Sequence, residues 1–149
     1  MKSPLSVLLL IACLSLAACG GVDPNSPMGQ RQALFKQMLK TSENLGGMLR
    51  GRIEFAETRF VEGAAQLDQL ARQPWQHFPQ IKEDDQTGAK DEVWQRQARF
   101  QELARALEAS TAALVTATVA KPLTIATLSP ALQRVEDACE ACHKEFRAF

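Results

Sequence analysis

Four separate stretches of the chain carry apolar residues at intervals of three and four positions, the spacing of α-helices that bury one face. The first stretch covers residues 30–49 and stops before Gly51, because glycine favours the left-handed turn that ends a helix. The pair Gly46–Gly47 weakens its last turn. The second stretch covers residues 55–72 and stops before Pro74, since proline has no backbone N–H to continue a helix.

A long loop and a third helix follow. Residues 74–89 contain prolines, a glycine and paired aspartates, so we expect a loop there, with the aromatic rings of Trp75 and Phe78 buried within it. Helical periodicity returns over residues 90–120, and a proline follows at position 122.

The fourth helix is expected to begin with Ser129 as its N-cap and Pro130 as its first residue, and to run to Arg147. Nowhere do apolar and polar residues alternate with the period of two that marks a strand. Long helices joined by moderate connections predict an all-α fold, an antiparallel up-down-up-down four-helix bundle.

The N-terminal segment has the pattern of an export signal. Residues 5–16 are almost continuously apolar, but the run is shorter than the roughly 20 residues that a membrane-spanning helix needs. It ends in Leu-Ala-Ala-Cys, which resembles the lipobox of bacterial lipoproteins, with Cys19 as the lipidated residue. We therefore expect a signal peptide at residues 1–18, a lipid-anchored flexible tether at 19–29 and a folded domain at 30–149. An ordinary signal peptide, with Cys19 merely nearby, is the alternative.

Charge and composition exclude several classes of protein. Lys and Arg total 17, Asp and Glu also total 17, and this balance gives no basic field for binding nucleic acid. There are two histidines and no arrangement of a nucleophile beside a base, so we expect that the protein is not an enzyme.

The chemistry lies at the C-terminal end, where Cys139, Cys142 and His143 form a C-x-x-C-H motif, the attachment signature of c-type haem. Two cysteines three residues apart lie on one helix face and can form two thioether bonds to one haem, while the adjacent imidazole ligates its iron. A redox C-x-x-C motif would need a βαβ context, and a zinc site would need four ligands, for which only His77 remains. Attachment of haem outside the cytoplasm agrees with export.

A C-terminal C-x-x-C-H motif on a four-helix chain resembles the class II cytochromes, specifically cytochrome c′, over residues 30–149. Further positions similar to that family are Arg31 and Gln32, Phe35 and Met38, Gly51 with Phe55, Pro74 and Trp75 with Phe78, Trp94 and Phe100, and Arg147.

The resemblance implies a five-coordinate iron with Phe35 over its open side, because a phenyl ring cannot ligate iron. Such an iron would bind NO or CO, and would also transfer single electrons. The alternative is a six-coordinate electron carrier in which Met38 is the second ligand, although Met38 also suits simple core packing. A structural lipoprotein bundle without haem is the remote alternative.

Each of the other matching residues has two possible interpretations, namely a role in the haem pocket and an ordinary structural role. Arg31, with Gln32, either pairs with a haem propionate or is a solvated residue of the first turn. Arg147 either lies beside the imidazole or is a favourable cation at a helix C-terminus. The aromatic residues Trp75, Phe78, Trp94 and Phe100 are expected in the haem wall or the core.

The expected surroundings are the periplasmic side of a bacterial membrane, reached through Cys19, with an unidentified redox partner protein. The sequence permits a homodimer through the first two helices, as in related proteins.

Overall fold

The computed structural model describes residues 22–79 and 87–148. The signal peptide and the lipidation expected at Cys19 lie outside these residues. The described elements are α2 (Pro27–Leu49), α3 (Glu57–Ala71), the short 3-10 helix η2 (Pro74–His77), α4 (Glu92–Gln95), α5 (Gln97–Ala117) and α6 (Ile125–Phe146).

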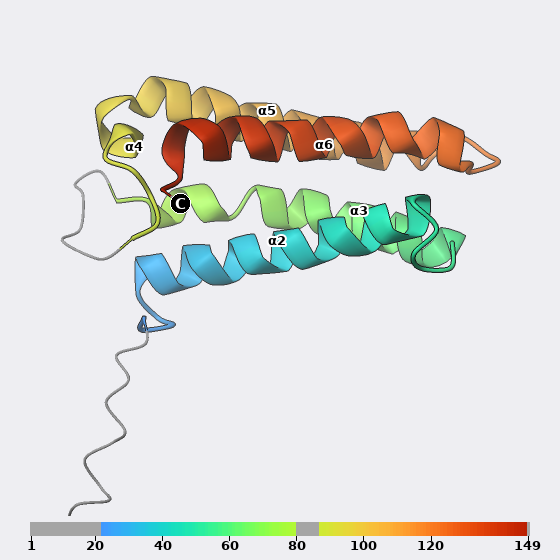
Figure 1. Ribbon diagram of the computed structural model, residues 1–149, viewed down its shortest axis with the longest axis horizontal. Coiled ribbons are helices and arrows are strands. Elements are labelled where there is room, and N and C mark those ends of the chain that lie inside the picture. Colours follow the sequence, from blue (N-terminus) through green and yellow to red (C-terminus); the bar gives the residue numbers. More distant parts are fainter. Residues whose placement is uncertain (1–21, 80–86, 149) are drawn as a thin grey trace, which may run out of the picture.

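The four long helices form the antiparallel bundle that the sequence predicts (Figure 1). Helix α2 packs on α3, α3 on α5, α5 on α6, and α6 closes the ring against α2. Within the described residues the only β-type pairing is an isolated bridge between Ala89 and Arg147. The same described part contains no helix that is both long and apolar enough to cross a membrane.

The core of the bundle is built from apolar side chains contributed by all four long helices. Phe60, Leu45, Leu67, Leu114 and Leu132 are almost completely buried. Each such side chain contributes about 1.5–3 kcal/mol relative to exposure. A second apolar cluster lies where α5 begins and α6 ends, and contains Val93, Phe100, Leu103 and Phe146.

Helix α2 begins three residues before the predicted start, so the tether expected at residues 19–29 is too long at its C-terminal end. The Ser26 hydroxyl caps the helix by accepting a hydrogen bond from the Gly29 N–H at 3.0 Å, and Pro27 occupies the first helical position. The helix ends as predicted, with Gly51 in the left-handed region at a φ of 71°.

Helix α6 begins at Ile125, and the prediction of Ser129 as its cap is wrong. Thr124 is the cap, and its hydroxyl accepts a hydrogen bond from the Thr127 N–H in a capping box. Pro130 therefore lies inside the helix, where it removes one backbone hydrogen bond. The extra N-terminal turn is retained because it carries the fully buried Leu128 into the core.

The third predicted helix is divided. Arg96, with φ −123° and ψ 45°, separates α4 from α5 although the sequence there contains neither Pro nor Gly. At this break the Arg96 guanidinium donates to Glu145 at 2.9 Å and lies over the ring of Phe146. Both partners belong to α6, some 50 residues along the chain.

Candidate functional site

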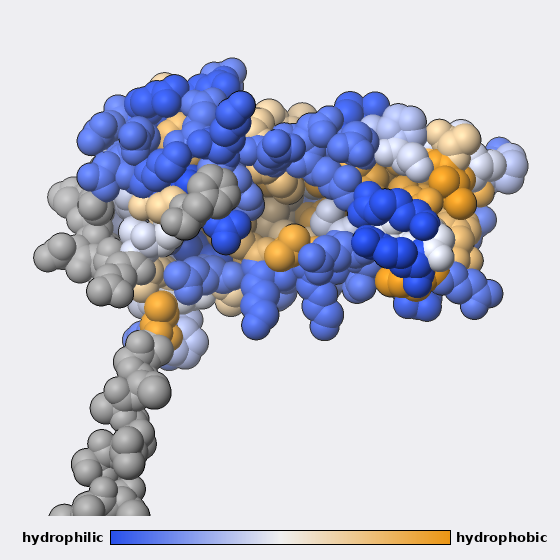
Figure 2. Space-filling model, in the orientation of Figure 1, coloured by the Kyte–Doolittle hydropathy of each residue, from blue (hydrophilic) through white to orange (hydrophobic). Residues whose placement is uncertain are grey.

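A cavity of about 670 Å³ opens between α2 and α6. Figure 2 shows the hollow as pale and orange apolar surface between hydrophilic rims. Its volume lies within the range of pockets that hold drug-sized ligands and cofactors. Most of its lining is apolar and comes from α2, α6, η2 and α5.

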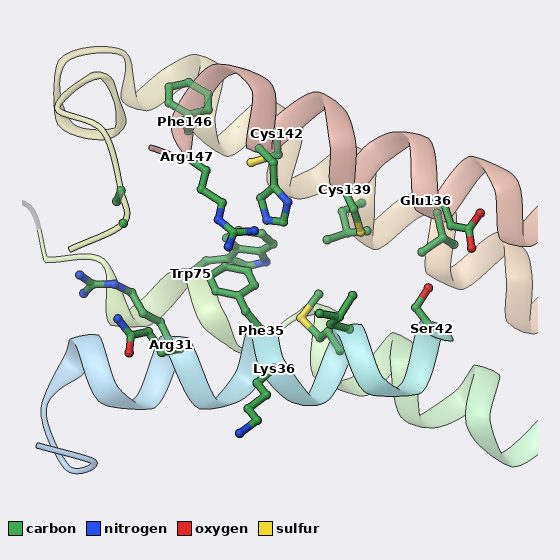
Figure 3. A pocket seen from close by; sticks show the side chains of 18 of the residues that line it. Arg31, Phe35, Lys36, Ser42, Trp75, Glu136, Cys139, Cys142, Phe146 and Arg147 are labelled. Carbon is green, nitrogen blue, oxygen red and sulfur yellow. The ribbon is translucent and has the colours of Figure 1, made fainter. Parts of the chain in front are cut away.

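The α6 wall presents Cys139, Cys142 and His143 to the cavity (Figure 3 labels the two cysteines). The three residues lie on one helix face because their spacing matches a helical turn. Burial, followed by the negative charge of Glu136, raises the pKa of the Cys139 thiol to about 11. Burial also raises the pKa of Cys142 to about 11. Neither thiol is part of a disulfide, so both are available for covalent attachment.

The imidazole of His143 is held in its neutral form. Burial is the main cause that lowers its pKa, and the nearby Arg147 guanidinium lowers it further. A neutral imidazole has a free nitrogen lone pair, which is the form that ligates a metal.

The α2 wall lies opposite, and its Phe35 projects toward the imidazole. The ring centroids of Phe35 and His143 are 6.5 Å apart, with the planes at 73°. Met38 also lines the cavity, but its side chain is only 5% exposed and packs in the bundle core. Both residues that the sequence left open for this position therefore line the cavity.

Aromatic side chains close one end of the cavity. Trp75 and Phe78 reach it from η2 and its cap, and Phe100 reaches it from α5, as expected. The centroid distances are 5.8 Å for Trp75–Phe100, 4.9 Å for Phe78–Phe100 and 6.0 Å for Phe35–Trp75. Trp94 is not part of this wall, and its indole N–H donates to the carbonyl oxygen of Pro79 at 2.9 Å.

The three polar residues expected at the site all line the cavity. Arg31 is 3% exposed, donates to the His77 carbonyl oxygen at 2.9 Å, and lies 4.8 Å from the ring centroid of Phe78. Arg31 is therefore buried, and the alternative that it is a solvated residue of the first turn is wrong. Gln32 and Arg147 are exposed at the rim. Arg147 follows the last residue of α6, and its side chain reaches toward Phe35 (Figure 3).

Sequence reasoning missed several residues of the lining, namely Lys36, Leu39, Ser42, Glu43, Arg50, Glu136 and Phe146. Glu136 and Phe146 lie three residues before Cys139 and three after His143, so helical spacing alone would have found them. No local signal identifies Arg50, because it reaches the cavity only through the packing of α2 against α6.

The donor groups fit a covalently attached haem better than a bare metal ion. In the part of the chain that the structure describes, no group of three or more His, Cys, Asp or Glu is arranged to hold a metal. Two thiols and one imidazole instead converge on an apolar cavity. Among the residues that the structure describes, the buried indole N–H of Trp75 in the same lining has no hydrogen-bond partner, so a polar edge of an occupant would satisfy it.

Comparison with known proteins gives a consistent result. The family model described as cytochrome c′ matches residues 26–147. A cytochrome c′ of Rhodopseudomonas palustris is 28% identical over 122 residues, which is 81% of each chain.

Solved structures agree in fold. The cytochrome c′ of Shewanella frigidimarina has a TM-score of 0.78 at 24% identity, with 87% of this chain and 100% of that chain covered. The nitric oxide complex of a cytochrome c′ variant from Alcaligenes xylosoxidans has a TM-score of 0.75 at 21% identity, with coverage of 87% and 98%. Because the family model spans nearly all of the described residues, the chain belongs to the cytochrome c′ family, and its cofactor is covalently attached haem c.

Proposed function

We propose that this protein binds a small neutral gas, NO or CO, at a five-coordinate haem iron. The observation that carries the proposal is the ring of Phe35, 6.5 Å from the ring of His143 across the cavity. A phenyl ring offers iron no ligand, so Phe35 would leave that side of the iron without a protein ligand.

The roles of the remaining residues follow from their positions. Cys139 and Cys142 would hold the haem through thioether bonds, and neutral His143 would be its axial ligand. The bound haem supplies an iron that takes up diatomic ligands and single electrons. Arg31 and the orphaned indole N–H of Trp75 would face the polar edge of the haem, since both line the cavity.

Gas binding is supported by similar proteins, one described as a nitric oxide complex and one as carbon monoxide bound. The role is ligand binding, together with single-electron transfer to an unidentified redox partner, rather than enzymatic catalysis. A second candidate is a six-coordinate electron carrier, favoured by the position of Met38 in the same lining, one turn from Phe35.

The absorption spectrum of the purified ferric holoprotein tests the proposal. A five-coordinate iron gives a high-spin spectrum that is the same in Met38→Ala. A low-spin spectrum with a methionine-to-iron band that is lost in Met38→Ala would establish the six-coordinate carrier. Protein that stays colourless when produced with an active haem-attachment system would instead favour the structural lipoprotein.

We also propose that the protein is exported to the periplasm and anchored through lipidated Cys19, with residues 1–18 removed. Cys19→Ala should move the holoprotein from the membrane fraction to the soluble periplasmic fraction, and an unchanged distribution would refute the anchor. The homodimer through α2 and α3 is tested by sedimentation equilibrium of the holoprotein.

A further inference from the structure

A bidentate ion pair joins α2 to α6 at one end of the cavity. The guanidinium of Arg50, the C-cap residue of α2, donates to both carboxylate oxygens of Glu136 on α6. The nitrogen–oxygen distances are 3.3 Å from Nη1 to Oε2 and 3.1 Å from Nη2 to Oε1. Both side chains line the cavity, so the pair is part of the cavity wall.

A glycine makes room for this pair. A Cβ atom built on Gly46 would lie 1.9 Å from Nη2 and 2.7 Å from Cζ of Arg50, so the guanidinium lies directly against the glycine backbone. Glycine inside a helix costs about 1 kcal/mol relative to alanine. The close contact with the Arg50 guanidinium gives a reason for a glycine at position 46, although glycine weakens the helix.

The pair also lies beside the functional residues. Glu136 is one helical turn before Cys139 on the cavity-facing side of α6, and Figure 3 shows it facing Ser42 of α2. Helix α2 carries Phe35, and α6 carries the cysteines and His143. Any outward movement of α2 from α6 would therefore widen the gap between the two walls of the site.

We propose that Arg50 and Glu136 form an ionic clasp that holds α2 against α6 and limits the rate at which a gas enters the cavity. This inference rests on the proposed function. The Arg50 and Glu136 side chains are 47% and 29% exposed, so solvent screens the clasp and its contribution is modest. Its bidentate geometry makes it stronger than a single surface contact.

The rate of CO binding to the ferrous holoprotein after flash photolysis tests the clasp. Arg50→Gln, Glu136→Gln and Gly46→Ala should each raise the association rate about two- to fivefold, the range expected for one exposed pair. Gly46→Ala keeps both charges and favours the helix, and its Cβ displaces the Arg50 guanidinium from its present position. The double variant Arg50→Gln/Glu136→Gln should be no faster than either single variant, because both remove the same interaction.

Arg72→Gln is the matched control. Arg72 pairs with Asp68 at 2.8 Å, its side chain is 49% exposed, and it lies outside the cavity lining. Its loss should leave the rate unchanged. Salt provides a test without mutation. Because CO is uncharged, charge does not steer it to the protein, so an increase of the wild-type association rate with ionic strength would indicate that salt weakens the clasp. The rates of the clasp variants should not depend on salt.

Hydrogen–deuterium exchange gives a readout independent of gas binding. Peptides that contain residues 46–50 and 133–139 should exchange faster in Arg50→Gln holoprotein than in wild type or Arg72→Gln. Rates and exchange that match wild type in all three clasp variants would overturn the clasp. A wild type that takes up no CO would refute the proposed function instead, and exchange would then decide whether the clasp exists.

Discussion

Replacing Phe35 by alanine tests the central assignment of the site. The phenyl ring is half-buried and packs edge-on against Trp75 at 6.0 Å, Phe78 at 6.4 Å and His143 at 6.5 Å. A fully buried Phe→Ala change costs about 3–5 kcal/mol, and we expect about 1–2 kcal/mol for this half-buried ring on a cavity wall. The variant should therefore fold, which makes its ligand kinetics measurable.

The kinetic effect of Phe35→Ala should accompany the loss of stability and be of similar size. If the ring blocks the open side of the iron, its removal should raise the CO association rate at least tenfold, which corresponds to about 1.4 kcal/mol of barrier. Urea unfolding measures the stability of the holoprotein, and flash photolysis measures the rate.

Phe78→Ala is the matched control for Phe35→Ala. Phe78 is half-buried, belongs to the same aromatic cluster and contacts Phe100 at 4.9 Å, and no ring contact joins it to His143 within the described residues. It should lose similar stability with less than a twofold change in rate. If Phe35→Ala loses stability but binds CO at the wild-type rate, the ring packs against the site without blocking it, and the assignment fails.

Three further predictions concern the fold that holds the site. Gly51→Ala should lower the free energy of unfolding by about 1 kcal/mol, because its φ of 71° strains any residue with a Cβ; thermal denaturation measures the loss. Leu128→Ala should cost about 2–5 kcal/mol in urea unfolding, since the side chain is fully buried, and a cost near zero would refute the account of the first turn of α6. Glu145→Gln should lower stability at neutral pH. The hydrogen bond from Arg99 is the main cause that lowers the pKa of the Glu145 carboxyl, so its stabilisation is present above the unfolded pKa of about 4.3 and is lost as pH falls through the folded value. The difference in unfolding free energy between wild type and Glu145→Gln should therefore begin to shrink below about pH 4.3, and a difference that stays constant down to pH 3 would contradict the pairing.

Features that depend on short stretches of chain were predictable from the sequence. Apolar periodicity identified the four long helices, because a buried helix face repeats every three or four residues. The C-x-x-C-H motif brought Cys139, Cys142 and His143 to one helix face for the same reason. Gly51 ended the first helix as expected, since its backbone conformation is a local requirement.

Helix boundaries were less predictable where two local signals competed. Ser129 and Pro130 form a good N-terminal signal, but Thr124 and Thr127 form another one, five residues earlier. The second signal prevails because it allows Leu128 to enter the core, and burial of a leucine offsets the hydrogen bond that Pro130 removes. That choice depends on the neighbouring helices, and no local pattern contains it.

By itself, then, the sequence determined the helical class and the attachment motif, both of which follow from side chains within a few turns of one another. The aromatic residues of the wall were expected only from the resemblance to cytochrome c′. Only the tertiary structure shows the Phe35 ring 6.5 Å from the His143 ring, and Met38 buried in the core while it lines the same cavity. The same packing joined Arg50 to Glu136, residues 86 positions apart. Such pairs depend on the distance and rotation between α2 and α6, which are set by the packing of the whole bundle rather than by either helix alone.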